Sequence, residues 1–66
     1  MTLDEYTKEV KDSFSKLAKR SQKDIDDYFN EQETIQYIEE GFYYYENEDM
    51  AAAHPHAVAS CLDMLY

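Results

Sequence analysis

Apolar residues near the start of the chain recur every three or four positions, the spacing that places side chains on one face of a helix. They are Leu3, Tyr6, Val10, Phe14 and Leu17. Thr2 and Glu5 have the spacing of a capping box, in which each side chain bonds to the backbone N–H of the other residue. The pattern predicts a first helix over about residues 3–20.

A second apolar stripe follows Ser21, a residue type that often caps helix N-termini. Tyr28, Ile35 and Phe42 lie at seven-residue steps, so an unbroken helix keeps all three on one face. We therefore predict a long middle helix over about residues 23–45.

Two signals within the middle helix compete with that continuity. Asn30, with Glu33 three residues later, has the pattern of another helix start, and Gly41 can end a helix in the left-handed conformation. If the helix ended at Gly41, residues 42–45 would be extended, and a lone strand has no partner with which to pair. Residues 42–45 are therefore predicted to be helical, while a break at Asn30 or at Gly41 stays open.

Pro55 marks the start of the last predicted helix, because proline suits the first helical position and pushes the preceding residue out of helical angles. A short helical turn is predicted just before it, over residues 51–53. The last helix is predicted over about residues 55–65, and its apolar stripe consists of Val58, Cys61, Leu62 and Leu65.

Glycine and proline each occur once, which is too few for the tight turns of a small all-β domain. Three helices with short connections predict an all-α fold, a small antiparallel three-helix bundle that forms a single domain over residues 1–66. A chain of 66 residues is close to the smallest size at which one hydrophobic core suffices, so a homodimer is an open alternative.

Charge is divided unevenly between the two halves of the chain. Residues 1–30 carry six basic and seven acidic side chains, whereas residues 31–66 carry eight acidic side chains and no basic one. The net charge of −9 therefore belongs almost entirely to the second half. Such a surface repels a phosphate backbone, so direct binding of nucleic acid is disfavoured.

Three further features bear on the compartment. The single cysteine, Cys61, cannot form a disulfide within the chain, so the fold does not depend on an oxidising environment. The first residues lack the basic and apolar regions of a signal peptide, and no stretch approaches the roughly 20 apolar residues of a membrane span. We expect a cytoplasmic protein with no membrane partner.

The acidic second half also carries a run of aromatic residues, Phe42 to Tyr45. At 100° per residue these four side chains cannot all face inward on one helix, so Tyr43 and Tyr44 are predicted to be exposed. Exposed aromatics beside carboxylates are typical of protein–protein contacts, although they can also simply cover the edges of the bundle. The candidate partner-binding residues are Glu39, Glu40, Tyr43, Tyr44, Glu46, Glu48 and Asp49.

No residue pattern in the chain is typical of catalysis or of a metal site. His54 and His56 lie near acidic residues, but the spacing matches no zinc or calcium motif, so neither a metal nor a cofactor is expected. Cys61 is predicted to be buried on its helix and therefore inert, which leaves the histidines without a nucleophile. We expect the protein not to be an enzyme.

Two short segments carry a resemblance to known proteins: AHPHAVA at residues 53–59 and CLDMLY at residues 61–66. This pattern resembles the C-terminus of small uncharacterised acidic proteins carried on bacterial conjugative transposons. The resemblance covers about the final fifth of the chain. It implies an accessory role on a mobile element that meets host defence or transfer machinery, and it carries no functional residues with it.

The sequence favours a non-catalytic module that binds another protein through its acidic, tyrosine-rich helical surface. The alternative is an acidic mimic of nucleic acid, which would occupy the basic cleft of a DNA-handling or defence protein and inhibit it. The basic end of the first helix, at residues 16–23, complements the acidic surface and offers a contact within the chain or between two copies.

Overall fold

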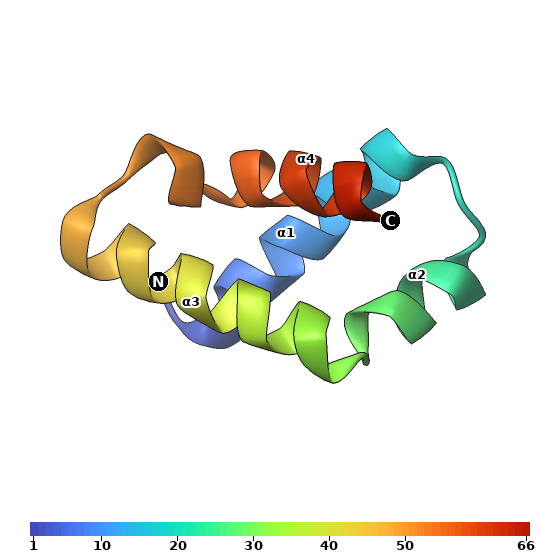
Figure 1. The fold of residues 1–66 in the computed structure, drawn as a ribbon, viewed down its shortest axis with the longest axis horizontal. Coiled ribbons are helices and arrows are strands. Elements are labelled where there is room, and N and C mark those ends of the chain that lie inside the picture. Colours follow the sequence, from blue (N-terminus) through green and yellow to red (C-terminus); the bar gives the residue numbers. More distant parts are fainter.

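Four α-helices and one turn of 3₁₀ helix make up the chain, which the computed structural model describes from Met1 to Tyr66. No strand is present, so the all-α prediction is confirmed. The elements, shown in Figure 1, are α1 (Leu3–Ala18), α2 (Gln22–Phe29), α3 (Gln32–Glu48), the 3₁₀ turn η1 (Ala51–Ala53) and α4 (Pro55–Leu65). None of the helices is both long enough and apolar enough to cross a bilayer.

The first helix begins at the predicted capping box. The Thr2 hydroxyl oxygen accepts from the Glu5 backbone N–H at 3.2 Å, and the Glu5 carboxylate accepts from the Thr2 backbone N–H at 2.9 Å. The helix ends at Ala18 because Lys19 adopts a left-handed conformation, with φ of 51°. The predicted helix is therefore present and ends two residues earlier than expected.

The predicted middle helix is two helices, so the chain has four helices instead of three, and of the two breaks left open the one at Asn30 is present. The break lies at Asn30 and Glu31: α2 ends at Phe29, and Glu31 is extended, with ψ of 139°. Gly41 lies inside α3 with ordinary helical geometry and is not a cap. Residues 42–45 are helical, as predicted, and α3 continues to Glu48.

The core forms around α1, which runs across the other three α-helices and contacts each of them (Figure 1). Its buried residues are Tyr6, Val10 and Phe14. The other helices contribute Ile25, Phe29, Ile38, Val58, Ala59 and Leu62 to the same cluster. Because α4 packs chiefly on α1, the C-terminal helix holds its position without close packing along α3.

The predicted apolar stripe of α4 is only half correct. Val58 and Leu62 are buried against α1, but Cys61 and Leu65 are exposed. The buried face contains Ala59 instead, whose small side chain permits α4 to approach α1 closely. Leu65 and Cys61 lie on a second apolar side of the helix that α1 does not cover.

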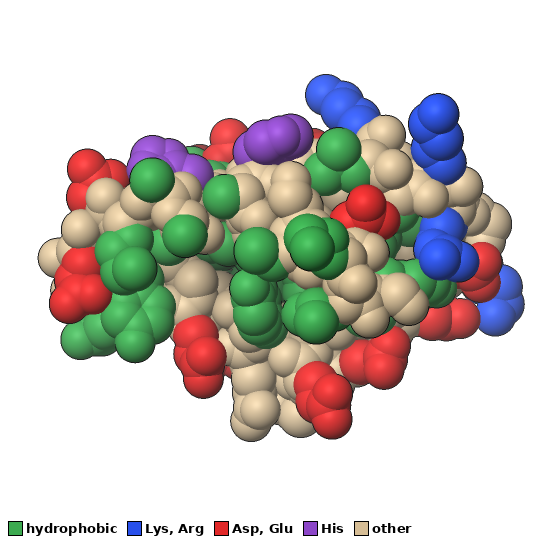
Figure 2. All heavy atoms as spheres, turned by 45° about the horizontal axis from the view of Figure 1, so that its top comes forward, with side chains coloured by type: hydrophobic (Ala, Val, Ile, Leu, Met, Phe, Trp, Pro, Cys, Tyr) green, Lys and Arg blue, Asp and Glu red, His purple; other side chains and the backbone are tan.

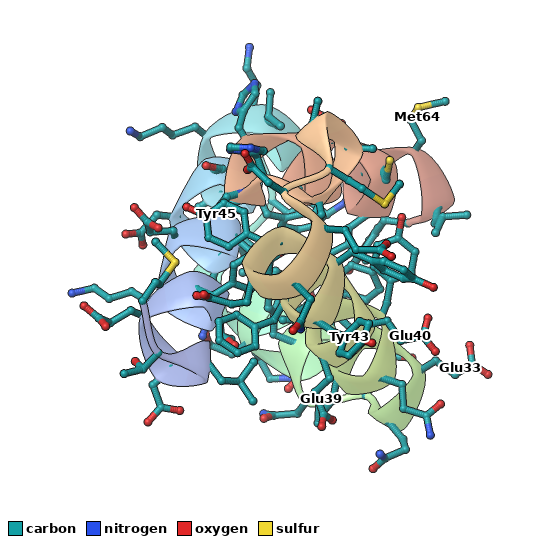
Figure 3. The ribbon with its side chains drawn as sticks, turned by 90° about the vertical axis from the view of Figure 1, so that its left-hand side faces the viewer. Glu33, Glu39, Glu40, Tyr43, Tyr45 and Met64 are labelled. Carbon is teal, nitrogen blue, oxygen red and sulfur yellow. The ribbon has the colours of Figure 1, made fainter.

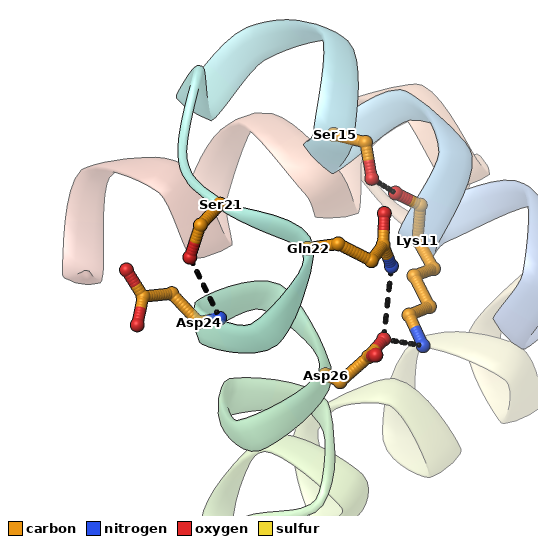
Figure 4. A network of polar contacts seen from close by, with 6 residues as sticks. All are labelled: Lys11, Ser15, Ser21, Gln22, Asp24 and Asp26. Atoms are coloured by element: carbon orange, nitrogen blue, oxygen red, sulfur yellow. Dashed lines mark hydrogen bonds and ion pairs between the residues drawn. The ribbon is translucent and has the colours of Figure 1, made fainter.

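A polar network joins the middle of α1 to α2, as Figure 4 shows. The Lys11 ammonium lies 2.6 Å from the Asp26 carboxylate, which also accepts a 2.9 Å hydrogen bond from Gln22. These two donors hold the pKa of Asp26 below its usual range, Lys11 having the larger effect. The network is exposed, so it orients α2 more than it stabilises the fold.

Ser21→Ala is expected to lower the free energy of unfolding by about 1 kcal/mol, because it removes the cap of the short helix α2. The Ser21 hydroxyl oxygen accepts from the Asp24 backbone N–H at 3.2 Å (Figure 4). Urea denaturation followed by circular dichroism measures the change. Ser13→Ala is the control, since Ser13 lies within α1 and makes no side-chain hydrogen bond; equal effects of the two substitutions would contradict the capping role.

The buried hydroxyl of Tyr6 makes the free energy of unfolding fall at alkaline pH. Burial raises the pKa of Tyr6 from 10.0 to about 12, so the unfolded chain loses this proton first. The stability that the neutral phenol contributes is present below pH 10 and is lost as the pH rises toward 12. Burial also raises the pKa values of Tyr28 and Tyr37, which adds to the loss in the same direction.

We therefore expect the free energy of unfolding to fall when urea titrations move from about pH 9 to about pH 11. Tyr6→Phe, measured over the same interval, should show a smaller fall, because the substitution removes one of the three phenols whose pKa is raised. The fall that remains comes from Tyr28 and Tyr37. An identical pH dependence in wild type and Tyr6→Phe would contradict this explanation.

Candidate functional site

All seven candidate partner-binding residues lie on the second half of α3 or directly after it, and all are exposed. Tyr43 and Tyr44 are 59% and 43% exposed, so the prediction that these two tyrosines face solvent is confirmed. Their rings contact each other edge to face, with centroids 5.5 Å apart. Phe42 and Tyr45 pack against the core instead.

The candidate residues do not form one patch, because they divide between two sides of α3. Glu39, Tyr43 and Glu46 follow one another at helical spacing on one side. Glu40 and Tyr44 lie on the other side, together with Glu33. Figure 3 shows Glu33 and Glu40 projecting in a direction clearly different from that of Glu39.

A groove lies on the Glu40 side of α3, and the sequence interpretation missed it. One hollow of about 530 Å³ is lined by residues of α2, α3 and α4, including Tyr28, Tyr37 and Leu65. A second hollow of about 190 Å³ lies between α3, η1 and α4 and is lined by Tyr44, Met50 and again Tyr37. Because Tyr37 lines both, the two hollows lie next to each other along the side of α3 that is nearest α4, and together they make up this groove.

Charge on this half of the molecule is almost uncompensated. All eight acidic side chains of residues 31–66 are exposed. Only two of them contact a basic group: Glu46 lies 3.6 Å from the N-terminal ammonium, and Asp49 lies 3.4 Å from His54, which is charged only when protonated. On the face drawn in Figure 2, the visible lysine and arginine side chains gather at the end of the molecule opposite η1.

The basic end of α1 does not dock on α3 within the chain. Lys23 pairs with Asp27 one turn along α2, at 3.1 Å. The Arg20 guanidinium lies over the ring of Tyr66, 3.9 Å from its centroid. The contact within the chain that the sequence left open is therefore absent, and the acidic side chains of α3 stay free for another molecule.

Two tyrosines of the groove, Tyr28 and Tyr37, have raised pKa values and stay neutral at ordinary pH. Burial, followed by the neighbouring thiol of Cys61, raises the pKa of Tyr37. Burial also raises the pKa of Tyr28, whose hydroxyl donates to the Leu62 carbonyl at 3.2 Å. Carboxylates alone therefore supply the charge of this surface, and the phenols supply apolar area and neutral hydrogen bonds.

No group of three or more histidine, cysteine, aspartate or glutamate side chains lies close enough to hold a metal ion. His54 contacts Asp49 and packs edge to face on Tyr45, with ring centroids 4.9 Å apart. The sequence predicts that Cys61 is inert because it is buried. The prediction of burial is wrong, because the thiol is exposed.

The geometry thus presents an acidic helix with Tyr43 on its outward side and with Tyr44 at a groove lined by hydrophobic and acidic side chains. Comparison of the chain with protein-family models, with curated proteins and with solved structures gives no match.

Proposed function

We propose that this protein is a non-catalytic interaction module that binds a partner protein through α3. The observation that carries the proposal is the pair of exposed, mutually packed rings of Tyr43 and Tyr44. Tyrosine is enriched at the energetic centres of protein interfaces because it offers a large apolar area at a small loss of conformational freedom. Because the two rings already contact each other in the free protein, they lose less conformational freedom on binding than two separate tyrosines would.

The carboxylates around the two tyrosines give the partner its chemistry. Glu39, Glu40, Glu46 and Glu48 lie within one turn of the pair and have no lysine or arginine beside them. Complementary potential accelerates association and excludes acidic competitors. The favoured partner therefore presents a basic surface with an apolar centre.

The test compares immobilised wild type with the double variant Tyr43→Ala/Tyr44→Ala in capture from a lysate of the native host, at low and at high salt. We expect wild type to retain one protein at both salt concentrations and the double variant to lose it, since apolar anchors resist screening. Leu17→Ala is the control, because it removes a 38% exposed apolar side chain from α1. Equal retention by wild type and the double variant would contradict the proposal.

The second candidate function, inhibition by mimicry of nucleic acid, is favoured by one observation. Eight exposed carboxyl groups in 36 residues have almost no compensating charge, as on a phosphate backbone. A mimic would bind basic DNA-handling proteins with an affinity that collapses as salt rises, and reversal of the charges at Glu39, Glu40, Glu46 and Glu48 would abolish binding. Retention that persists at high salt would exclude this candidate.

A further inference from the structure

The groove between α3 and α4 is a second surface, distinct from the outward side of α3 that carries Glu39 and Tyr43. We call it the α3–α4 groove; its walls are Tyr37 and Tyr44 of α3, Leu65 of α4, and Met50 before η1. The groove exists because α4 packs on α1, which leaves the side of α4 nearest α3 without close packing.

The walls of the groove leave a large part of their apolar surface exposed. Leu65 is 69% exposed, Met50 and Tyr44 are each nearly half exposed, and Met64 beside Leu65 is the most exposed large apolar residue of the molecule. Figure 2 shows hydrophobic side chains gathered over α4 and the η1 end, above a row of acidic ones. An apolar patch with a polar rim marks an interaction site in a soluble domain.

The rim of the groove is acidic. Glu31 and Glu33 line its larger hollow, and Glu40 lines the smaller one. No lysine, arginine or histidine lines either hollow. An occupant with basic residues on both sides of an apolar centre would therefore match the rim and the walls together.

The all-helical fold decides the shape of the occupant. An extended peptide gains affinity by pairing with an exposed strand edge, and this structure has no strand. The other common arrangement is an amphipathic helix that places its apolar side in a groove. The residues of α3 that line the groove run from Glu33 to Tyr44, about 17 Å of helix, so about three turns of an occupant can contact this wall.

We propose that the α3–α4 groove binds a basic amphipathic helix of another protein. The apolar side of the bound helix contacts Tyr37, Tyr44 and Leu65, and the lysine or arginine side chains of that helix lie against Glu33 and Glu40. The inference rests on the proposed function, because the bound helix belongs to the partner protein proposed above. The groove adds a second contact surface and defines the chemistry of that partner. A second copy of this chain fits poorly, since two copies that each carry a net charge of −9 repel each other.

The experiment uses the whole ¹⁵N-labelled chain and three synthetic peptides of about four helical turns. The first combines leucine and lysine at amphipathic spacing, the second has the same composition rearranged to remove that spacing, and the third replaces lysine with glutamate. At about 0.15 M salt, we expect the first peptide alone to bind and to shift the amide signals of Tyr37, Tyr44 and Leu65.

Two pairs of matched variants locate the binding. Leu65→Asp is expected to weaken binding of the first peptide at least about tenfold, while Leu17→Asp on α1 leaves it unchanged. Glu40→Lys should weaken binding more than Glu39→Lys, since both change the charge equally and only Glu40 lines the groove. All four residues are exposed, and far-UV circular dichroism of each variant checks that folding is retained.

Four results would overturn the inference. Two of them are binding of the rearranged peptide, or of the glutamate peptide, as tight as that of the first peptide. The others are amide signal shifts confined to surfaces outside the groove, and signals of the groove that change with the concentration of the protein when no peptide is present. The last result would assign the groove to a second copy. Tyr43→Ala separates this inference from the proposed function, because Tyr43 does not line the groove. Capture of a partner that depends on Tyr43 but not on Leu65 leaves the proposed function standing and removes this inference.

Discussion

Phe14→Ala is expected to remove a large share of the protein's stability at 25 °C. Phe14 is completely buried, and its ring packs against the rings of Tyr28 and Phe29, each at 5.3 Å between centroids. Removing a buried phenylalanine ring lowers the free energy of unfolding by about 3–5 kcal/mol. A domain of this length has a total of only about 3–10 kcal/mol, so the loss is at least about a third of the total.

Far-UV circular dichroism during urea titration measures this effect. The control is Leu17→Ala on the same helix, three residues along the chain, where the side chain is partly exposed and the loss should stay below about 1 kcal/mol. A midpoint of denaturation for Phe14→Ala equal to that of the control would contradict the central place of Phe14 in the core.

Gly41→Ala is expected to destabilise the protein by about 1–3 kcal/mol, although alanine is the better helix former. A Cβ at position 41 would lie 2.7 Å from the hydroxyl oxygen of Tyr6 and 3.3 Å from a methyl group of Val58. The Tyr6 hydroxyl cannot easily move, because it donates a buried 2.6 Å hydrogen bond to the Ala53 carbonyl.

A double-mutant cycle tests the cause of that destabilisation. Tyr6→Phe alone should lower the free energy of unfolding by about 1–3 kcal/mol, since the buried Ala53 carbonyl loses its donor. Combined with Tyr6→Phe, Gly41→Ala should have a smaller effect than it has alone, because the closest atom is gone. Strictly additive losses would show that the contact between Gly41 and Tyr6 does not limit the size of the side chain.

The parts of the fold that could be predicted from the sequence depend on neighbouring residues. The capping box of Thr2 and Glu5 and the position of Pro55 act within one turn of helix, and both helices begin where those signals indicate. The exposure of Tyr43 and Tyr44 follows from helical geometry alone, and it too is confirmed.

The break between α2 and α3 could not be decided in the same way, because Tyr28, Ile35 and Phe42 stay in phase across it. Both a continuous helix and two helices satisfy that periodicity. The chain turns at Asn30 because α2 and α3 each pack on α1, a contact between distant segments that local patterns do not contain.

The groove was missed for a similar reason. The last helix carries apolar residues on two sides, and periodicity alone does not show which side α1 covers. The buried side is that of Val58 and Leu62, so Cys61 and Leu65 remain outside. A surplus of apolar residues on a short helix was the available signal, and it was interpreted as one wide buried stripe.

The packing of α1 on α4 also bears on how the protein is made. The hydrogen bond from Tyr6 to Ala53 joins residues 47 positions apart, and the largest helix–helix interface joins the first helix to the last. While the chain emerges from the ribosome, α1 therefore lacks its largest contact until α4 follows, although α2 and α3 already cover part of it. A chain that stops before Pro55 would leave the side of α1 that packs on α4 exposed to proteases and chaperones, so nascent or truncated molecules should be cleared quickly while complete ones persist.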